Sequence, residues 1–184
     1  MCVEETHRSA RWFALAVRPR FDQAVARALE RRGHETFLPL YRRHDQSGAR
    51  PVESELPLFP GYVCCRFDVR NRLPILATPG VIHILGAGNT PAALDDIEVA
   101  SLQTAIRSQL RLQPFPFIQA GQRVRIQSGE LAGVEGIVMS FSQTLRLVLS
   151  ITLLQRSVLV EIGRDAAIFS TCSNTAPFEL VKGD

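Results

Sequence analysis

The 184-residue sequence predicts an α+β protein in which an amino-terminal antiparallel sheet with flanking helices is followed by a linker and a small five-stranded β-barrel. Two observations predict this division. The first half alternates strand-like apolar runs with amphipathic helical segments, a pattern typical of helices packed on a sheet. The second half contains short apolar runs separated by glycines, a pattern typical of small barrels. We expect the first domain at 11–111, the linker at 112–117, the barrel at 118–170 and a tail at 171–184.

The first domain should begin with a strand at 12–17, where an aromatic-led apolar run ends at a proline. Proline lacks a backbone N–H and therefore stops a strand inside a sheet. A helix is predicted from Phe21 to Gly33, because apolar residues recur with helical spacing and a glycine stands where helices commonly end. A second strand is expected at 36–41, and the polar segment 42–55 is predicted to be an exposed hairpin or a flexible loop.

The most informative motif is Pro57-Leu58-Phe59-Pro60-Gly61-Tyr62-Val63, which opens a third strand that ends at Phe67. Its prolines and glycine stiffen the backbone, so the aromatic rings of the motif are held in fixed positions. Rings held in this way suit docking to a partner, whereas they cannot carry a proton or act as a nucleophile. A short helical connection at 73–77, a turn at Pro79-Gly80 and a fourth strand at 81–85 follow.

The next helix is expected to open at Asp95, because Glu98 stands three residues later, as in a capping box. Two prolines in the segment 113–116 then interrupt the helical pattern, since each disfavours the helical conformation of the residue before it. This segment is the predicted linker. The barrel strands are predicted at 122–127, 135–141, 145–151, 157–162 and 167–169.

The charge of the chain is weakly positive and unevenly distributed, with a net value of +3. Up to Arg111 there are 15 arginines against 12 acids, whereas six basic and six acidic residues follow, so the first domain holds the excess. Lys182 is the only lysine, and arginine can pair with phosphate or stack on bases. A GC-rich genome would produce the same bias. The arginines therefore permit nucleic-acid binding without indicating it.

No targeting or membrane segment is evident in the sequence. No apolar run approaches the ~20 residues that a membrane-spanning helix requires. Residues 1–11 lack the apolar core of a secretory signal. We therefore expect a cytoplasmic monomer that does not contact a membrane.

No pattern indicates an enzyme, a metal site or a cofactor. There is no phosphate-cradling glycine loop and no pairing of a nucleophile with a base, so we nominate no catalytic residue. Cys64 and Cys65 are adjacent in a predicted strand and point to opposite faces, and the chain has no CxxC pair, so buried or idle thiols are expected. The four histidines show no metal-ligand spacing: His7, His34, His44 and His83.

Several motifs together resemble those of NusG-type transcription elongation factors. In the first domain they are the Trp12-Phe13 strand, the motif at 59–63, Pro79-Gly80-Val81 and the helix from Asp95. The segments 121–126 and 129–138 resemble a KOW motif in the carboxy-terminal barrel of the same family. The resemblance covers 12–169, and it implies an NGN-like domain followed by an SH3-like KOW barrel.

The resemblance implies that the first domain binds RNA polymerase. Its partners would be the clamp helices of the bacterial β′ subunit and, across the cleft, the β lobe. The implied contact residues are Phe59, Tyr62, Trp12 and Phe13. Aromatic anchors carry much of the energy where a helical tip meets an apolar groove. The alternative for Trp12 is a place in the core, because an aromatic residue that leads a strand is usually buried.

The resemblance also implies contact with the exposed non-template DNA strand. The candidates are Arg18, Arg20, Arg70, Asn71 and Arg72. Arginine beside a single strand can pair with phosphates and stack on unpaired bases. The alternative is a solvated charged face.

In general NusG proteins the barrel contacts the termination factor Rho or ribosomal protein S10 through a loop that bears an aromatic residue. This chain has Leu153, Leu154 and Arg156 in the matching place, without the aromatic residue. These three residues are candidates for a partner contact. The alternative for the two leucines is a place in the barrel core.

The segment 17–20 replaces the small polar and glycine turn of general factors. With the segment 35–40, it resembles specialised paralogues such as the RfaH, UpxY and LoaP proteins, which act as antiterminators. We therefore expect an operon-specific transcription elongation and antitermination factor. A general NusG that couples polymerase to Rho or the ribosome is one alternative, and a KOW-type RNA-binding or ribosome-associated protein is another.

Overall fold

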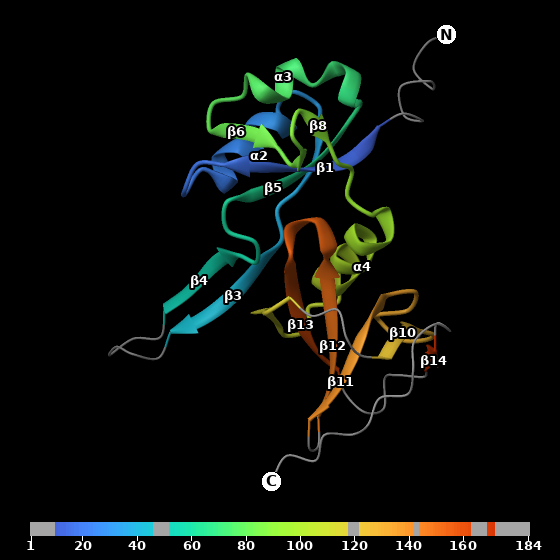
Figure 1. Cartoon of the computed structure of the whole chain (residues 1–184). Coiled ribbons are helices and arrows are strands. Elements are labelled where there is room, and N and C mark those ends of the chain that lie inside the picture. The colour runs from blue at the N-terminus through green and yellow to red at the C-terminus, as the bar shows by residue number, and fades with distance from the viewer. Residues whose placement is uncertain (1–9, 46–51, 118–121, 142–143, 163–168, 172–184) are drawn as a thin grey trace. The chain divides into compact units, whose positions relative to one another are not determined.

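The computed structural model describes residues 10–45, 52–117, 122–141, 144–162 and 169–171 (Figure 1). The chain forms two compact units. The first contains residues 1–99 and 151–154, and the second contains residues 100–150 and 155–184. Helix α4 (Asp96–Arg107) therefore begins in the first unit and continues in the second.

A four-stranded antiparallel sheet forms the centre of the first unit, with the strand order β2-β5-β1-β6. Strands β1 (Arg11–Val17) and β5 (Tyr62–Phe67) lie in the middle and pair with each other. Strands β2 (Glu35–Phe37) and β6 (Val81–Ile84) form its two edges. The predicted α+β class, with an amino-terminal antiparallel sheet, is confirmed.

The strand expected at 36–41 is divided in two. Strand β2 ends before Pro39, and β3 (Leu40–Asp45) then pairs with β4 (Val52–Pro57) in a separate hairpin. The division occurs at Pro39 because proline has no N–H to offer a neighbouring strand. The carbonyl of Pro39 instead accepts a hydrogen bond of 2.8 Å from the N–H of Leu58. Of the two structures considered for 42–55, the chain adopts the hairpin.

Two helices, α2 (Asp22–Glu30) and α3 (Leu73–Leu76), pack on one face of the sheet. Helix α2 is followed by Gly33, whose φ of +83° gives the left-handed ending that the sequence predicts. The guanidinium of Arg32 donates to the carbonyl of Pro74 at 3.1 Å and to the hydroxyl of Thr78 at 2.8 Å. Arg32 therefore ties the end of α2 to the end of α3.

Buried apolar side chains fill the space between the sheet and these helices. Burying each large side chain among them stabilises the fold by about 1.5–3 kcal/mol. The buried residues of this core are Phe13, Leu15, Val17, Val25, Ala26, Leu29, Val63, Cys65, Phe67 and Ile75.

The other face of the sheet, which we call the second face, is also apolar. Alternate residues of β1 and β5 point to it, and Trp12, Ala14 and Cys64 are each at most 5% exposed. A strand that is apolar on both faces reads as a continuous apolar run, as residues 12–17 do.

Three turns of one type meet at the end of β1. Each has proline in its second position and a residue with positive φ in its third, which defines a type II turn. The turns are 18–21, 59–62 and 78–81, with closing N–H to carbonyl distances of 3.0, 3.1 and 3.1 Å. The N–H of Val17 donates to the carbonyl of Gly61, and that of Arg18 donates to the carbonyl of Gly80. Val17 is the last residue of β1 and Arg18 is the first residue of the turn 18–21, so these two hydrogen bonds join all three turns.

The start of α4 is capped as the sequence predicts. The side chain of Asp95 accepts hydrogen bonds from the N–H groups of Ile97 at 2.7 Å and Glu98 at 3.4 Å. The carboxylate of Glu98 bonds elsewhere within the first unit, because it accepts from the N–H and hydroxyl of Thr152. Asp95 therefore supplies its half of the capping box, while Glu98 serves a different contact.

The second unit contains a six-stranded antiparallel sheet with the order β14-β10-β11-β12-β13-β9. Ile137, Val148 and Leu159 form a buried cluster in it. The strands of this sheet are β9 (Leu112–Phe115), β10 (Gln122–Ile126), β11 (Glu135–Phe141), β12 (Thr144–Ile151), β13 (Arg156–Ile162) and β14 (Phe169–Thr171).

Four short elements belong to the first unit. They are β7 (Gly86–Ala87), β8 (Thr90–Pro91), η1 (Val69–Asn71) and η2 (Thr152–Leu154).

The predicted linker differs from the structure, because its residues 112–115 form strand β9. This strand pairs with β13, and Pro114 lies opposite Val158. Proline is tolerated because β9 is at the edge of the sheet, where one side of the strand needs no ladder bonds. The sheet consequently has six strands where five were expected. Most of the predicted tail, residues 172–184, lies outside the described residues.

Among the residues that the structure describes, none of the helices has the length and apolar character needed to cross a bilayer.

Replacing Gly80 by alanine should destabilise the first unit by about 2–4 kcal/mol, because the backbone strain of a side chain at positive φ adds to the overpacking of the core around it. The glycine has a φ of +98°, and a Cβ there would lie 2.7 Å from Cδ1 of Phe21 and 2.9 Å from Cγ2 of Val25. Gly33→Ala is the matched control, since its φ is +83° but no atom lies within 4 Å of the added Cβ. Urea unfolding should show a loss of about 1–2 kcal/mol for the control. Equal losses would contradict the packing argument.

Candidate functional site

Trp12 and Phe13 lie on opposite faces of the sheet, as neighbours in a strand must. The ring of Phe13 packs in the core at 4.7 Å from that of Phe67, between ring centroids. The ring of Trp12 lies on the second face, edge-on to Phe37 at 6.5 Å. The structure therefore does not bring the two residues together.

The aromatic turn 59–62 holds its two rings differently. Phe59 is only 2% exposed, whereas Tyr62 is half-buried. Tyr62 pairs with Ala16 in the β1–β5 register, which places it on the same face as Trp12. Of the four predicted polymerase-binding residues, Trp12 and Tyr62 share the second face.

The position of the aromatic turn is fixed by the first turn of α2. The N–H of Gly61 donates to Oδ1 of Asp22 at 2.7 Å, and Asp22 is 7% exposed. A buried carboxylate requires such a donor, because taking its charge out of water is costly. Sequence reasoning missed Asp22. Its position just after the turn 18–21 gives no sign of a partner 39 residues away in the sequence.

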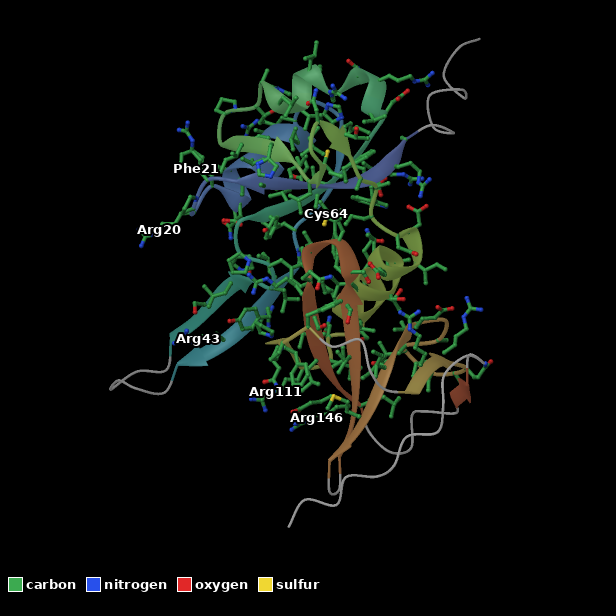
Figure 2. All side chains as sticks on the ribbon, viewed as in Figure 1. Arg20, Phe21, Arg43, Cys64, Arg111 and Arg146 are labelled. Carbon is green, nitrogen blue, oxygen red and sulfur yellow. The ribbon has the colours of Figure 1, made fainter. Side chains whose placement is uncertain are left out.

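The predicted DNA-contact residues fall into two groups. Arg18 and Arg20 are exposed on the turn 18–21, and Figure 2 shows Arg20 projecting from it. Arg70, Asn71 and Arg72 lie on η1 and at the start of α3. These two groups come from different loops of the first unit.

Arg70 is engaged within its own loop. Its guanidinium contacts Oδ2 of Asp68 at 2.7 Å, and its Nε contacts both carboxylate oxygens at 3.1 Å. The side-chain hydrogen bond and the charge of Asp68 raise the pKa of Arg70. This local pair makes Arg70 a weaker candidate for a DNA contact than Arg18 and Arg20.

The predicted contact residues of the barrel lie around η2. Leu154 is 6% exposed, Leu153 is half-buried, and Arg156 is exposed at the start of β13. Between them, Gln155 has a φ of +51°, so the chain turns sharply there. Leu154 thus occupies an interior position.

The two thiols of β5 lie on opposite faces of the sheet, Cys64 on the second face and Cys65 in the core. Burial raises the pKa of both Cys64 and Cys65 to about 12, so these thiols are neutral at ordinary pH. Within the described ranges, no group of three His, Cys, Asp or Glu side chains could hold a metal ion. What these residues offer to solvent is the partly exposed ring of Tyr62 and the exposed side chains of Arg18 and Arg20, which suit binding.

Comparison with known proteins identifies one family. The family model described as "Transcription termination factor nusG" matches residues 10–103. The transcription termination/antitermination protein NusG of Helicobacter pylori 26695 is 23% identical over 164 residues, which cover 82% of this chain and 93% of that protein. The protein of the same name from Deinococcus radiodurans R1 is 31% identical over 109 residues, which cover 50% of this chain and 57% of that protein.

A solved structure supports the fold. It is described as "Domain interaction in Thermotoga maritima NusG", and the match covers 90% of this chain and 99% of that one. The TM-score is 0.54 at 18% sequence identity. The similarity is therefore one of architecture.

Stability should fall as the pH rises from about 9 to about 12, because Cys64 and Cys65 ionise in the unfolded chain near 9.0 but not in the folded one. Below pH 9 both states hold the protons, and the stabilisation is fully present. Urea unfolding at about pH 8 and about pH 10 measures the loss. A Cys64→Ala, Cys65→Ala variant should lose less stability over this interval. Identical losses would contradict the assignment to the two thiols.

Proposed function

The chain belongs to the NusG family, and from this premise we propose that it is a transcription elongation factor that binds RNA polymerase and keeps it processive. The match of the family model over residues 10–103 supports this most directly. That range contains the whole four-stranded sheet, α2, α3 and the three proline turns. Because polymerase is the proposed partner, the proposed location is the cytoplasm.

The proposed contact with the clamp helices of β′ is centred on Tyr62, which lies on the second face and retains exposed surface. Aromatic anchors of this kind commonly dominate binding energy. Trp12 lies on the same face but is only 5% exposed, so it occupies the interior place that was the alternative for it. Phe59 acts as support for the turn, because it is only 2% exposed. Phe13 is not included, since its ring packs in the core.

The proposed mechanism is a shift of population. A second contact with the β lobe lets one protein bridge both sides of the polymerase cleft, so it binds the closed clamp better than the paused, swivelled one. Bound protein can bias that equilibrium only by the difference in its two affinities. A difference of about 1.4 kcal/mol changes the ratio of the two states tenfold.

We further propose that the protein is a specialised antiterminator. Two features support this: the segment 17–20 stands where general factors have a small polar and glycine turn, and the loop around η2 has no aromatic residue. A general NusG that couples polymerase to Rho or S10 is the second candidate. It is favoured by the names of the curated relatives, one of which matches over 93% of its length. An RNA-binding KOW protein is disfavoured by the equal numbers of basic and acidic residues after Arg111.

Replacing Tyr62 by alanine should weaken binding to the cognate RNA polymerase about tenfold or more, because the loss of an aromatic anchor commonly exceeds 1.4 kcal/mol. Transcription over a template with pause and termination sites should then lose the read-through that the unaltered protein confers. Tyr41→Ala is the matched control, since Tyr41 is the only other tyrosine and is also half-buried. Equal effects of the two variants on polymerase binding would rule out the proposed surface.

A pulldown with purified Rho and ribosomal protein S10 should separate the two candidates. We expect no stable capture of Rho, because Leu154 is interior and its loop offers no aromatic anchor. Capture of polymerase in the same experiment shows that the protein is active. Retention of Rho at a stoichiometric level would favour the general factor.

A further inference from the structure

Strand β9 covers one edge of β13 in the second unit over only part of its length. Residues 112–115 lie opposite residues 157–160, so the four residues of β9 face a strand of seven. The N–H of Glu161 also donates to the carbonyl of Arg111 at 3.2 Å, which extends the contact by one residue. Without β9, this edge of β13 would present unpaired backbone groups to any extended chain.

The register shows which backbone groups of β9 point toward β13. In an antiparallel pair, residue pairs that exchange hydrogen bonds alternate with pairs that do not. The bond between Glu161 and Arg111 marks a bonded pair, so Gln113 and Phe115 belong to bonded pairs as well. Pro114 lies between them, in a pair that is not bonded. The donor that proline lacks would therefore point away from β13, and the pairing loses no hydrogen bond.

Prolines remove hydrogen-bond donors from the outer side of β9. Pro114 has no N–H to offer there, and Pro116 follows it at the spacing that keeps the same side of an extended chain. A further strand that approached from outside would thus find two donors missing. The segment can complete the edge of β13 and at the same time stop the sheet from growing beyond it.

One aromatic side chain anchors β9 to the sheet. Phe115 is half-buried and packs against the cluster of Ile137, Val148 and Leu159. The rest of the strand is held less firmly, because Pro114 is exposed and the other two residues are only half-buried. By contrast, residues 157–160 of β13 are at most 2% exposed. The covering strand is therefore shorter and less buried than the strand it covers.

We propose that β9 is an intramolecular plug: it fills the strand-pairing edge of β13, and it must leave before an extended segment of another protein can add a strand there. Strand addition gains affinity from main-chain bonds and specificity from side-chain positions. The position of Phe115 favours a segment that carries an aromatic residue. Only the open state binds, so the apparent affinity falls with the fraction of open molecules. The proposal concerns the second unit and does not rest on the proposed contact with polymerase.

The test supplies the covering strand as a separate molecule to the full chain. The probe is a synthetic peptide of residues 109–117, and its binding is followed by NMR through the N–H signals of β13. Gln113→Pro removes a donor that points to β13 and should open the plug. The peptide should bind this variant about tenfold or more tightly than it binds the unaltered chain. The N–H of Leu159 should lose protection against hydrogen exchange by a similar factor.

Leu112→Pro is the matched control, because the N–H that it removes points away from β13. It should bind the peptide as weakly as the unaltered chain does, and the N–H of Leu159 should keep its protection. Phe115→Ser is a second opened variant, which weakens the plug through its side chain alone. It replaces Gln113→Pro if the new proline disturbs the sheet. Well-dispersed N–H signals from β13 report an intact sheet in each variant.

Three results would overturn the proposal: no peptide binding by the opened variants at about 1 mM, equal binding by the opened variants and the unaltered chain, or equal effects of Gln113→Pro and Leu112→Pro. Protection of the Leu159 N–H that rises with protein concentration would show that β9 of a second copy fills the edge. That result would overturn the intramolecular assignment. Failure to capture polymerase would reject the proposed function and leave the plug unaffected.

Discussion

The hydrogen bond between the N–H of Gly61 and the carboxylate of Asp22 is the constraint on which the site depends. The carboxylate is buried, so its charge must be met by a donor, and this one comes from the turn that carries Phe59 and Tyr62. The carbonyl of the same glycine accepts a hydrogen bond from the N–H of Val17. Both polar groups of one glycine thus fix the aromatic turn against the end of β1 and the start of α2.

The central strand β1 packs against apolar side chains on both faces of the sheet. Phe13 and Leu15 face the helices and stabilise the fold, while Trp12 and Ala14 face the other way. A change in register by one residue would exchange these roles, and the pairing of β1 with β5 prevents it. Apolar packing on both faces of the sheet consequently comes from one short segment of sequence.

Local patterns predicted much of this fold, and non-local contacts account for what they missed. The strand β1, the glycine end of α2 and the cap at Asp95 follow from neighbouring residues, and the structure has them all. The prolines before Phe117 signalled the end of a helix correctly, but only the pairing with β13 shows that they lie in an edge strand. In the site, the uniformly apolar run 12–17 lacked the polar contrast that separates Trp12 from Phe13. The Asp22–Gly61 bond joins distant positions and leaves no local trace.

Strand β9 lies at one edge of the six-stranded sheet, and Pro114 within it is exposed. An edge strand offers its free N–H and carbonyl groups to any other extended chain, which is a common route to aggregation. Proline removes one of those donors and places a rigid ring along the edge. The residue that hid this strand from sequence reasoning therefore also protects the folded molecule from joining sheets with its own copies.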